Sequence, residues 1–124
     1  MLKAYLDSMK LKVSQIDAAY PMSSPEGQYR GIPYTIRAIQ FAKALGCPCV
    51  DTTDGGRKPA GYTDAEVMAL MKQYYRVVLE WAERWKIIIN VEPHGPYTTN
   101  PDTMEEILSF SDSPYLRLNF DVVG

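Results

Sequence analysis

Carboxylate side chains come at the ends of four segments that each carry the pattern of a strand. They are Asp17, Asp51, Glu92 and Asp121. In segments 87–92 and 116–121, alternate side chains form one apolar face and one face that turns polar toward its C-terminal end, where it carries Asn90 and Asn119. Because ligands bind at the carboxyl-terminal edge of a parallel sheet, these residues are the candidates for chemistry.

The chemistry that these carboxylates could perform starts with a metal ion. Two oxygen ligands from neighbouring strands suit a divalent cation such as Mg²⁺ or Mn²⁺. A carboxylate after a strand is also common as a helix cap or a turn residue. We favour that second interpretation for Asp17 and Asp51. For Glu92 and Asp121 we favour the functional one, because their strands carry a polar face.

Strand-like and helix-like patterns alternate along the chain. Strands are predicted at 11–17, 47–52, 86–92 and 116–121, and helices at 1–10, 33–45, 63–85 and from 101 to about 110. Helix 63–85 has the clearest pattern, because Thr63 and Glu66 have the spacing of a capping box. Helix 33–45 is expected to bury one face, made of Tyr34, Ala38, Phe41, Ala42 and Leu45. Strands that alternate with helices predict a parallel sheet with right-handed crossovers.

The polar strand faces indicate which parallel fold this is. A doubly wound sheet is covered by helices on both faces, so its strands should be apolar on both. A barrel strand is apolar only where it meets the outer helices, and it carries ligand-binding side chains inside. We therefore predict a partial (β/α)₈ TIM barrel, an α/β half-barrel of about four parallel strands with intervening helices, forming a single domain over 1–124. A closed barrel needs about 250 residues, roughly twice this length.

Composition argues against several classes of protein. Hydrophobic residues make up 46% and charged residues 23% of the 124, as in an ordinary globular domain. No run of about 18 apolar residues predicts a transmembrane helix, and the N-terminus lacks the apolar core of a signal peptide. The net charge of −2 and the lack of a Lys/Arg cluster argue against nucleic-acid binding. Cys47 and Cys49 fit buried thiols in a reducing compartment, so we expect a cytoplasmic protein.

Two short motifs carry a resemblance to a known family. The sequence Ile-Ile-Ile-Asn-Val-Glu-Pro-His at 87–94 comes about thirty residues before Leu-Asn-Phe-Asp at 118–121. In this order the motifs resemble strand ends of the sugar phosphate isomerase/epimerase superfamily, the xylose isomerase-like TIM barrel group. Segments 38–47 and 100–108 also look like that family, so the resemblance covers nearly the whole chain.

The resemblance implies a metal site and a reaction. The family holds a divalent metal, here expected to be Mn²⁺ or Mg²⁺, with a Glu, an Asp, a His and a second Glu at the ends of four successive strands. Glu92 matches the first ligand and Asp121 the second, and the strands for the other two are absent from this sequence. In the family's epimerases the metal polarises a ketose carbonyl while two carboxylates move a proton on and off the adjacent carbon. By resemblance, Glu92 takes one of these acid–base roles.

Other polar residues near the predicted cavity are candidate substrate ligands. They are Asp17, Asp51, Asn90, His94 and Asn119. His94 does not match the missing metal ligand, and three interpretations stay open: it contacts substrate, it orients Glu92, or it is a plain loop histidine. The run Asp54-Gly55-Gly56-Arg57-Lys58 could contact a sugar or a phosphate through backbone N–H groups. A Gly-Gly pair is more often just a turn, and we favour that interpretation.

Two hypotheses from different classes follow. The first is a metal-dependent isomerase or epimerase acting on a sugar or sugar phosphate, with dehydration or elimination from keto sugars as a weaker variant. The second is a non-catalytic half-barrel, a fragment or module that gains function only by pairing. Four strands of a barrel leave two open edges, so we expect either a shortened chain or association with itself or with a partner chain. The acidic balance disfavours the DNA-binding branch of the same superfamily.

Overall fold

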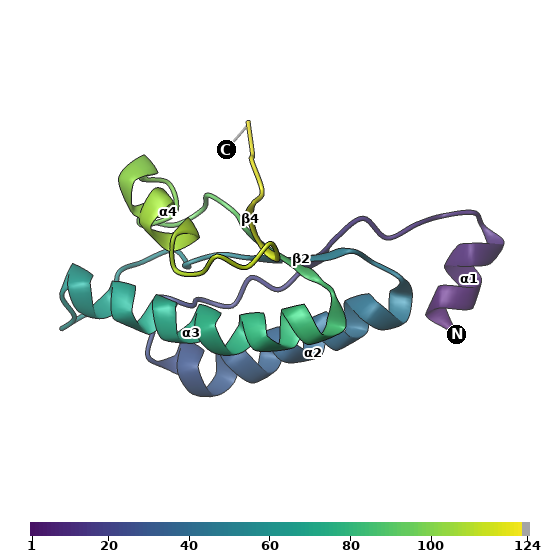
Figure 1. The fold of residues 1–124 in the computed structure, drawn as a ribbon, viewed down its shortest axis with the longest axis horizontal. Coiled ribbons are helices and arrows are strands. Elements are labelled where there is room, and N and C mark those ends of the chain that lie inside the picture. The colour runs from purple at the N-terminus through teal and green to yellow at the C-terminus, as the bar shows by residue number, and fades with distance from the viewer. Residues whose placement is uncertain (123–124) are drawn as a thin grey trace.

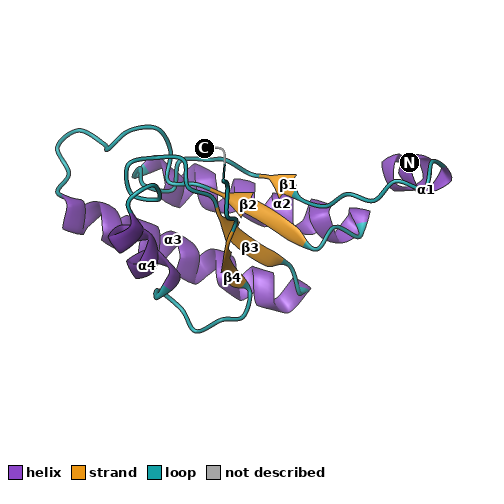
Figure 2. Ribbon diagram, turned by 90° about the horizontal axis from the view of Figure 1, so that it is seen from above, coloured by secondary structure: helices purple, strands orange, loops and turns teal. Residues whose placement is uncertain are grey.

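The computed structural model describes residues 1–122 and shows an α/β half-barrel (Figure 1). Its elements in chain order are α1 (Leu2–Ser8), β1 (Ile16–Asp17), the π-helical turn η1 (Gly27–Gly31), α2 (Ile32–Leu45), β2 (Cys49–Thr52), α3 (Asp64–Trp85), β3 (Ile88–Val91), α4 (Pro101–Leu108) and β4 (Leu116–Leu118). The four strands lie in the order β1-β2-β3-β4, and each pairs in parallel with its neighbour (Figure 2). The predicted alternation of strands and helices and the parallel sheet are confirmed.

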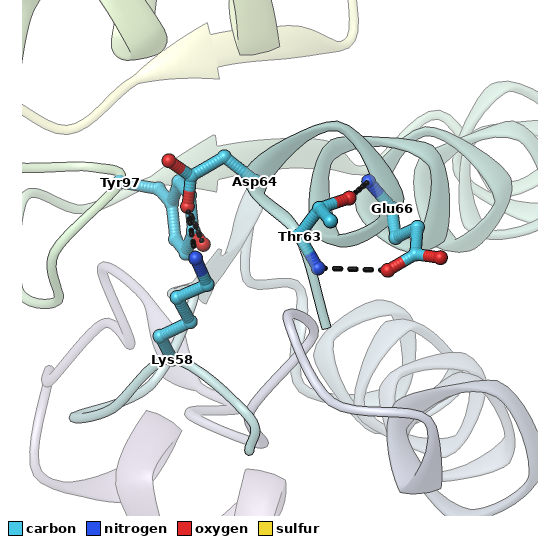
Figure 3. A network of polar contacts seen from close by, with 5 residues as sticks. All are labelled: Lys58, Thr63, Asp64, Glu66 and Tyr97. Carbon is cyan, nitrogen blue, oxygen red and sulfur yellow. Dashed lines mark hydrogen bonds and ion pairs between the residues drawn. The ribbon is translucent and has the colours of Figure 1, made fainter. Parts of the chain in front are cut away.

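Helices α2 and α3 lie side by side against one face of the sheet (Figure 1). Val50, Ile89 and Val91 of the strands are fully buried in this layer. Helix α3 begins with the predicted capping box: the Glu66 N–H donates to Thr63 Oγ1 at 3.2 Å, and the Thr63 N–H donates to Glu66 Oε2 at 2.7 Å (Figure 3). These bonds fix the start of a 22-residue helix that packs on the sheet.

Two adjacent and fully buried tyrosines of α3, Tyr74 and Tyr75, tie the helices to each other and to the sheet. The Tyr75 hydroxyl lies 3.0 Å from Thr52 Oγ1. Thr52 in turn donates to the Asn90 carbonyl at 2.7 Å, while the Tyr74 hydroxyl bonds with Thr35 of α2. Burial raises the pKa of both tyrosines, so their hydroxyls stay protonated and available as donors.

The edge strands are shorter than predicted. β1 starts only at Ile16, which lies opposite Val50, and residues 11–14 would extend beyond Cys49, the first residue of β2. β4 stops at Leu118 and does not continue to Asp121, because Leu118 pairs with Val91, the last residue of β3. Within residues 1–122 each edge strand has one neighbour, and β4 stops where that neighbour, β3, ends.

The predicted buried face of α2 is wrong in part. The buried residues are Ile32, Thr35, Ile39 and Ala42. Tyr34 and Phe41, which were expected inside, leave 49% and 47% of their surface exposed. The polar Thr35 is inside because the Tyr74 hydroxyl supplies its hydrogen-bond partner. The side of α2 that faces the core therefore contains Thr35 rather than Tyr34.

Candidate functional site

A row of polar residues crosses all four strands of the sheet. Asp17 pairs with Asp51, Asp51 with Asn90, and Asn90 with Arg117. Neighbouring residues along a strand point to opposite faces, and the row that contains Val50 packs under the helices. The Asp17–Arg117 row therefore lies on the inner face. The polar inner face predicted for β3 and β4 is confirmed, and it extends to β1 and β2.

At the carboxyl-terminal edge of the sheet, Asp51, Glu92 and Asn119 form one cluster. The Asn119 amide donates to Asp51 Oδ1 at 3.3 Å, and the Asp51 and Glu92 carboxyl groups share a hydrogen bond. Glu92 directly follows β3, and its N–H donates to the Thr52 carbonyl at 2.9 Å. Asn119 directly follows β4, and its N–H donates to the Val91 carbonyl at 3.0 Å. The backbone ladder of the sheet thus holds the residues of the cluster in place.

The Asp51 carboxyl group has a raised pKa. It is almost fully buried, and burial raises its pKa to about 8, with further contributions from the hydrogen bond to Glu92 and the Glu92 charge. The hydrogen bond from Asn119 acts in the opposite direction and lowers this pKa. The proton on Asp51 is therefore shared with Glu92, which lies at the end of the neighbouring strand.

Gln15 joins the polar face, although the sequence analysis did not identify it. Its Oε1 accepts a hydrogen bond from the Asn90 amide at 2.9 Å and one from Cys49 Sγ at 3.6 Å. Cys47 and Cys49 are both free thiols; Cys47 is buried as expected, whereas Cys49 is only half-buried. Gln15 comes two residues before Asp17, and in an extended segment that spacing places both on one side. The spacing is the signal that could have identified it.

The remaining candidates lie at or beyond the ends of their strands. Asp17 ends β1, His94 lies in the loop after β3, and Asp121 follows β4; all three are exposed. The cap or turn interpretation of Asp17 and Asp51 is wrong, because both lie in strands and neither caps a helix. Among residues 1–122, no set of three or more His, Cys, Asp or Glu side chains is arranged to hold a metal ion.

Asp54, in the loop after β2, is an anchor that the sequence analysis missed. Asp54 is fully buried, and its carboxylate accepts hydrogen bonds from the Gly95 N–H at 2.9 Å and from the Tyr97 N–H at 2.7 Å. Thr98 donates to it twice, through its hydroxyl at 2.7 Å and its N–H at 3.3 Å. The interpretation of the run 54–58 as a simple turn is therefore incomplete. Through these hydrogen bonds Asp54 joins the loop after β2 to the loop after β3.

Three loops at this edge of the sheet approach one another at backbone distance. A Cβ on Gly95 would lie 1.7 Å from the Gly55 carbonyl oxygen and 2.4 Å from Asp54 Oδ1. Gly55 has a φ of +92°, and a Cβ there would lie 2.7 Å from Pro21 Cβ. The Ser23 hydroxyl also donates to the Asp54 carbonyl. The loops after β1, β2 and β3 thus form one packed layer, which we call the loop layer.

Asp64 links the first turn of α3 to both neighbouring loops (Figure 3). The Tyr97 hydroxyl donates to Asp64 Oδ1 at 2.8 Å, and Lys58 Nζ lies 2.9 Å from the same oxygen. The hydrogen bond from Lys58 holds the pKa of Asp64 below its usual range, while burial and the Asp64 carboxylate raise the pKa of Tyr97 to about 12. These three side chains line a groove of about 810 Å³ between α3 and α4, which the Asp51–Glu92 cluster does not line.

Nearly the whole sequence matches one protein family. A family model described as a xylose isomerase-like TIM barrel matches residues 1–123. The chain belongs to the xylose isomerase-like TIM barrel family. No curated protein matches it in sequence. The resemblance drawn from the strand ends at 87–94 and 118–121 is therefore confirmed at the level of the family.

Solved structures share the fold of this xylose isomerase-like chain. A D-tagatose 3-epimerase-like protein has a TM-score of 0.83 at 21% identity, over 98% of this chain and 49% of its own. The 3-keto-D-glucoside 4-epimerase from E. coli also has a TM-score of 0.83, at 12% identity, over 94% of this chain and 51% of its own. A xylose isomerase-like protein from Mycobacterium smegmatis, in complex with magnesium, has a TM-score of 0.72 at 19% identity, over 97% and 44%. The chain spans about half the length of these structures.

Replacing Asp51 with asparagine is expected to stabilise the chain, and increasingly so as the pH rises. The folded chain keeps the Asp51 proton up to about pH 8, whereas an unfolded carboxyl group loses it near pH 4. The unfolded state therefore binds fewer protons in this window, and the stability of the wild-type chain falls as the pH rises through it. Asparagine has no proton to lose, and its amide can still donate to Glu92.

Urea unfolding at about pH 5 and about pH 8 measures the effect of Asp51→Asn. The gain in free energy of unfolding should be larger at the higher pH. Asp112→Asn changes an exposed carboxyl group and serves as the control, with no such trend expected. A gain that stays constant or shrinks between the two pH values would contradict the raised pKa of Asp51.

Proposed function

We propose that this chain carries part of the active site of a divalent-metal-dependent isomerase or epimerase that acts on a sugar or sugar phosphate. The observation that supports the proposal is the cluster of Asp51, Glu92 and Asn119 at the carboxyl ends of three neighbouring parallel strands. Barrel enzymes place their reacting groups at this edge. The similarity in fold to two structures named for sugar epimerases points in the same direction.

The cluster offers the kind of atoms that a hard cation binds. Carboxylate and amide oxygens suit Mg²⁺ and Mn²⁺, and one structure of the same fold is in complex with magnesium. In this proposal Glu92 and Asp121 are the metal ligands that the chain supplies. Residues 1–122 hold no set of three or more such ligands, so in this proposal water molecules fill the remaining positions around an ion bound to this chain. The cation would polarise the sugar carbonyl and stabilise the charge that develops on its oxygen.

In this proposal Glu92 is the residue that moves a proton to or from the carbon beside the carbonyl. Asp51 shares a hydrogen bond with Glu92 and so holds its carboxyl group in one orientation, as proton transfer to a substrate requires. The substrate hydroxyls have further partners at the same edge. The groups that would bind them belong to Asp17, Asp51, Asn90, His94 and Asn119.

Replacing Glu92 with glutamine is expected to weaken Mn²⁺ binding by at least about tenfold, because a charged oxygen ligand is lost. Calorimetric titration of the purified chain with Mn²⁺ measures the affinity, and a ketose epimerisation assay accompanies it. Glu105→Gln changes an exposed glutamate of α4 and should bind Mn²⁺ like the wild type. Absence of Mn²⁺ binding in the wild-type chain, or binding that Glu92→Gln leaves unchanged, would overturn the proposal for this polypeptide.

A second function has an observation of its own in its favour. Leu118 and Phe120, in and just after β4, leave 40% and 74% of their surface exposed. Within the described residues, β1 and β4 each also have one unpaired edge. Open edges and apolar surface favour association. The chain would then be a non-catalytic half-barrel that works only with a second copy or a partner chain.

Light scattering over a range of concentrations separates these two functions. A dimer that fails to bind Mn²⁺ supports the non-catalytic half-barrel, and a monomer that binds Mn²⁺ through Glu92 supports the enzyme. Elimination from a keto sugar would use the same cluster, and product analysis identifies it by the loss of water. No helix in the described part of the chain is long and apolar enough to cross a membrane. A cytoplasmic location and the lack of nucleic-acid partners stay predictions from composition.

A further inference from the structure

The buried side chain of Thr98 forms hydrogen bonds within the loop that follows Glu92. The His94 N–H donates to Thr98 Oγ1 at 2.8 Å, and the Gly95 N–H donates to the same oxygen at 3.1 Å. The single proton of the Thr98 hydroxyl goes to Asp54 Oδ1 at 2.7 Å. Asp54 is fully buried and Thr98 is 2% exposed, so water does not compete for these bonds.

The direction of these bonds follows from the charge of Asp54. Its carboxylate is acceptor-only, so it takes the Thr98 proton and leaves the Thr98 oxygen free to accept from the backbone of His94 and Gly95. Among the ion pairs of the described residues none involves Asp54, so N–H and O–H donors alone stabilise the buried charge. Releasing the loop would leave that charge without its partners, which is unfavourable.

We infer that Asp54 and Thr98 are positioning residues that fix the backbone of His94 beside the Asp51–Glu92 cluster, so that the imidazole meets a sugar substrate bound there. His94 is separated from Glu92 only by Pro93, whose ring restricts the backbone further. The substrate part of this inference rests on the proposed function. The backbone part rests on the hydrogen bonds alone.

Three substitutions separate positioning from general stabilisation of the loop. Thr98→Val keeps the shape of the side chain and removes the hydroxyl, whereas Thr98→Ser keeps the hydroxyl. Thr99→Val is the matched control, because the Thr99 hydroxyl bonds to the Gly95 carbonyl at 2.8 Å and touches neither Asp54 nor the His94 N–H. A merely structural effect of losing a loop hydroxyl would appear in both valine variants.

The backbone part is tested by amide hydrogen exchange measured by NMR. In Thr98→Val the His94 amide should exchange at least about tenfold faster, as expected for a lost hydrogen bond to a buried group. The amides of Tyr74 and Tyr75 in the core of α3 should be unaffected, which shows that the variant is folded. Thr98→Ser and Thr99→Val should keep the wild-type rate at His94. An unchanged rate in Thr98→Val would overturn the inference.

The substrate part uses the fact that His94 is the single histidine of the sequence, so its imidazole signals are unambiguous. With Mg²⁺ present, titration with D-fructose should shift these signals in the wild-type chain. Thr98→Val should need at least about fivefold more ketose for half the shift, and Thr98→Ser and Thr99→Val should match the wild type. Equal midpoints in all four proteins would overturn the positioning role. A wild-type chain with no ketose response would overturn the proposed function and the substrate part, and the exchange rates would still decide the backbone part.

Discussion

Replacing Gly95 with alanine is expected to prevent stable folding of the chain. The new Cβ would lie 1.7 Å from the Gly55 carbonyl oxygen and 2.4 Å from Asp54 Oδ1, and the nearer of these is a backbone atom that no rotamer change can move. Relief requires the loops after β2 and β3 to separate, which breaks the bonds around Asp54. We expect a loss of about 3 kcal/mol or more in the free energy of unfolding, measured by urea denaturation.

Gly56→Ala is the matched control for Gly95→Ala. Gly56 lies in the same loop layer, and a Cβ there would have no atom within 4 Å. Its φ is also outside the left-handed region. The control should therefore change the free energy of unfolding by less than about 1 kcal/mol. Similar stabilities for the two alanine variants would show that the loops do not pack as closely as the structure has them.

Removing the Asp54 side chain is the second change with a large expected effect. In Asp54→Ala the Tyr97 N–H and the Thr98 hydroxyl lose their acceptor while they stay buried, and the Gly95 N–H keeps only its bond to Thr98 Oγ1. Each unsatisfied group costs about 1 to 3 kcal/mol, so we expect a total loss of about 3 to 5 kcal/mol. Urea denaturation followed by circular dichroism measures it.

Asp54→Asn tests the charge separately from the shape. The asparagine amide keeps one acceptor oxygen, but its NH₂ group faces the N–H and O–H donors that surround Asp54. The stability of Asp54→Asn should therefore fall between those of the wild type and Asp54→Ala. Asp112→Ala removes an exposed carboxyl group and should stay within about 0.5 kcal/mol of the wild type. An Asp54→Ala variant as stable as this control would mean that the loop after β3 is held by other contacts.

The sheet and its inner face could be predicted from the sequence because their signals are local. In β3 the alternation of Ile89 and Val91 with Asn90 and Glu92 is set by the geometry of a single strand. The start of α3 was equally local, since its capping box lies within four consecutive residues. Such patterns can be interpreted without knowing which distant residues pack against them.

The features that were missed depend on partners far away in the sequence. Asp54 followed by two glycines has the composition of a turn, and nothing near it indicates that the loop after β3 supplies its donors. The predicted buried face of helix 33–45 did not include Thr35, whose partner in the core, the Tyr74 hydroxyl, lies 39 residues away. Asp51 was taken for a cap or turn residue because its partner Glu92 lies on another strand. In each case long-range packing decided the outcome.

The separation of these partners along the chain also bears on how the protein forms. Ser23 and Asp54 are 31 residues apart, and Asp54 and Thr98 are 44 apart. Contacts across such long stretches close slowly, because the entropy of the intervening chain must be lost first. We therefore expect the edge that carries Glu92 to assemble late in folding, after α3 has packed on β2. During synthesis Asp54 gains its first donor from the loop after β3 only when Gly95 has been added, so this edge of the sheet cannot assemble before β3 and the loop after it have been made.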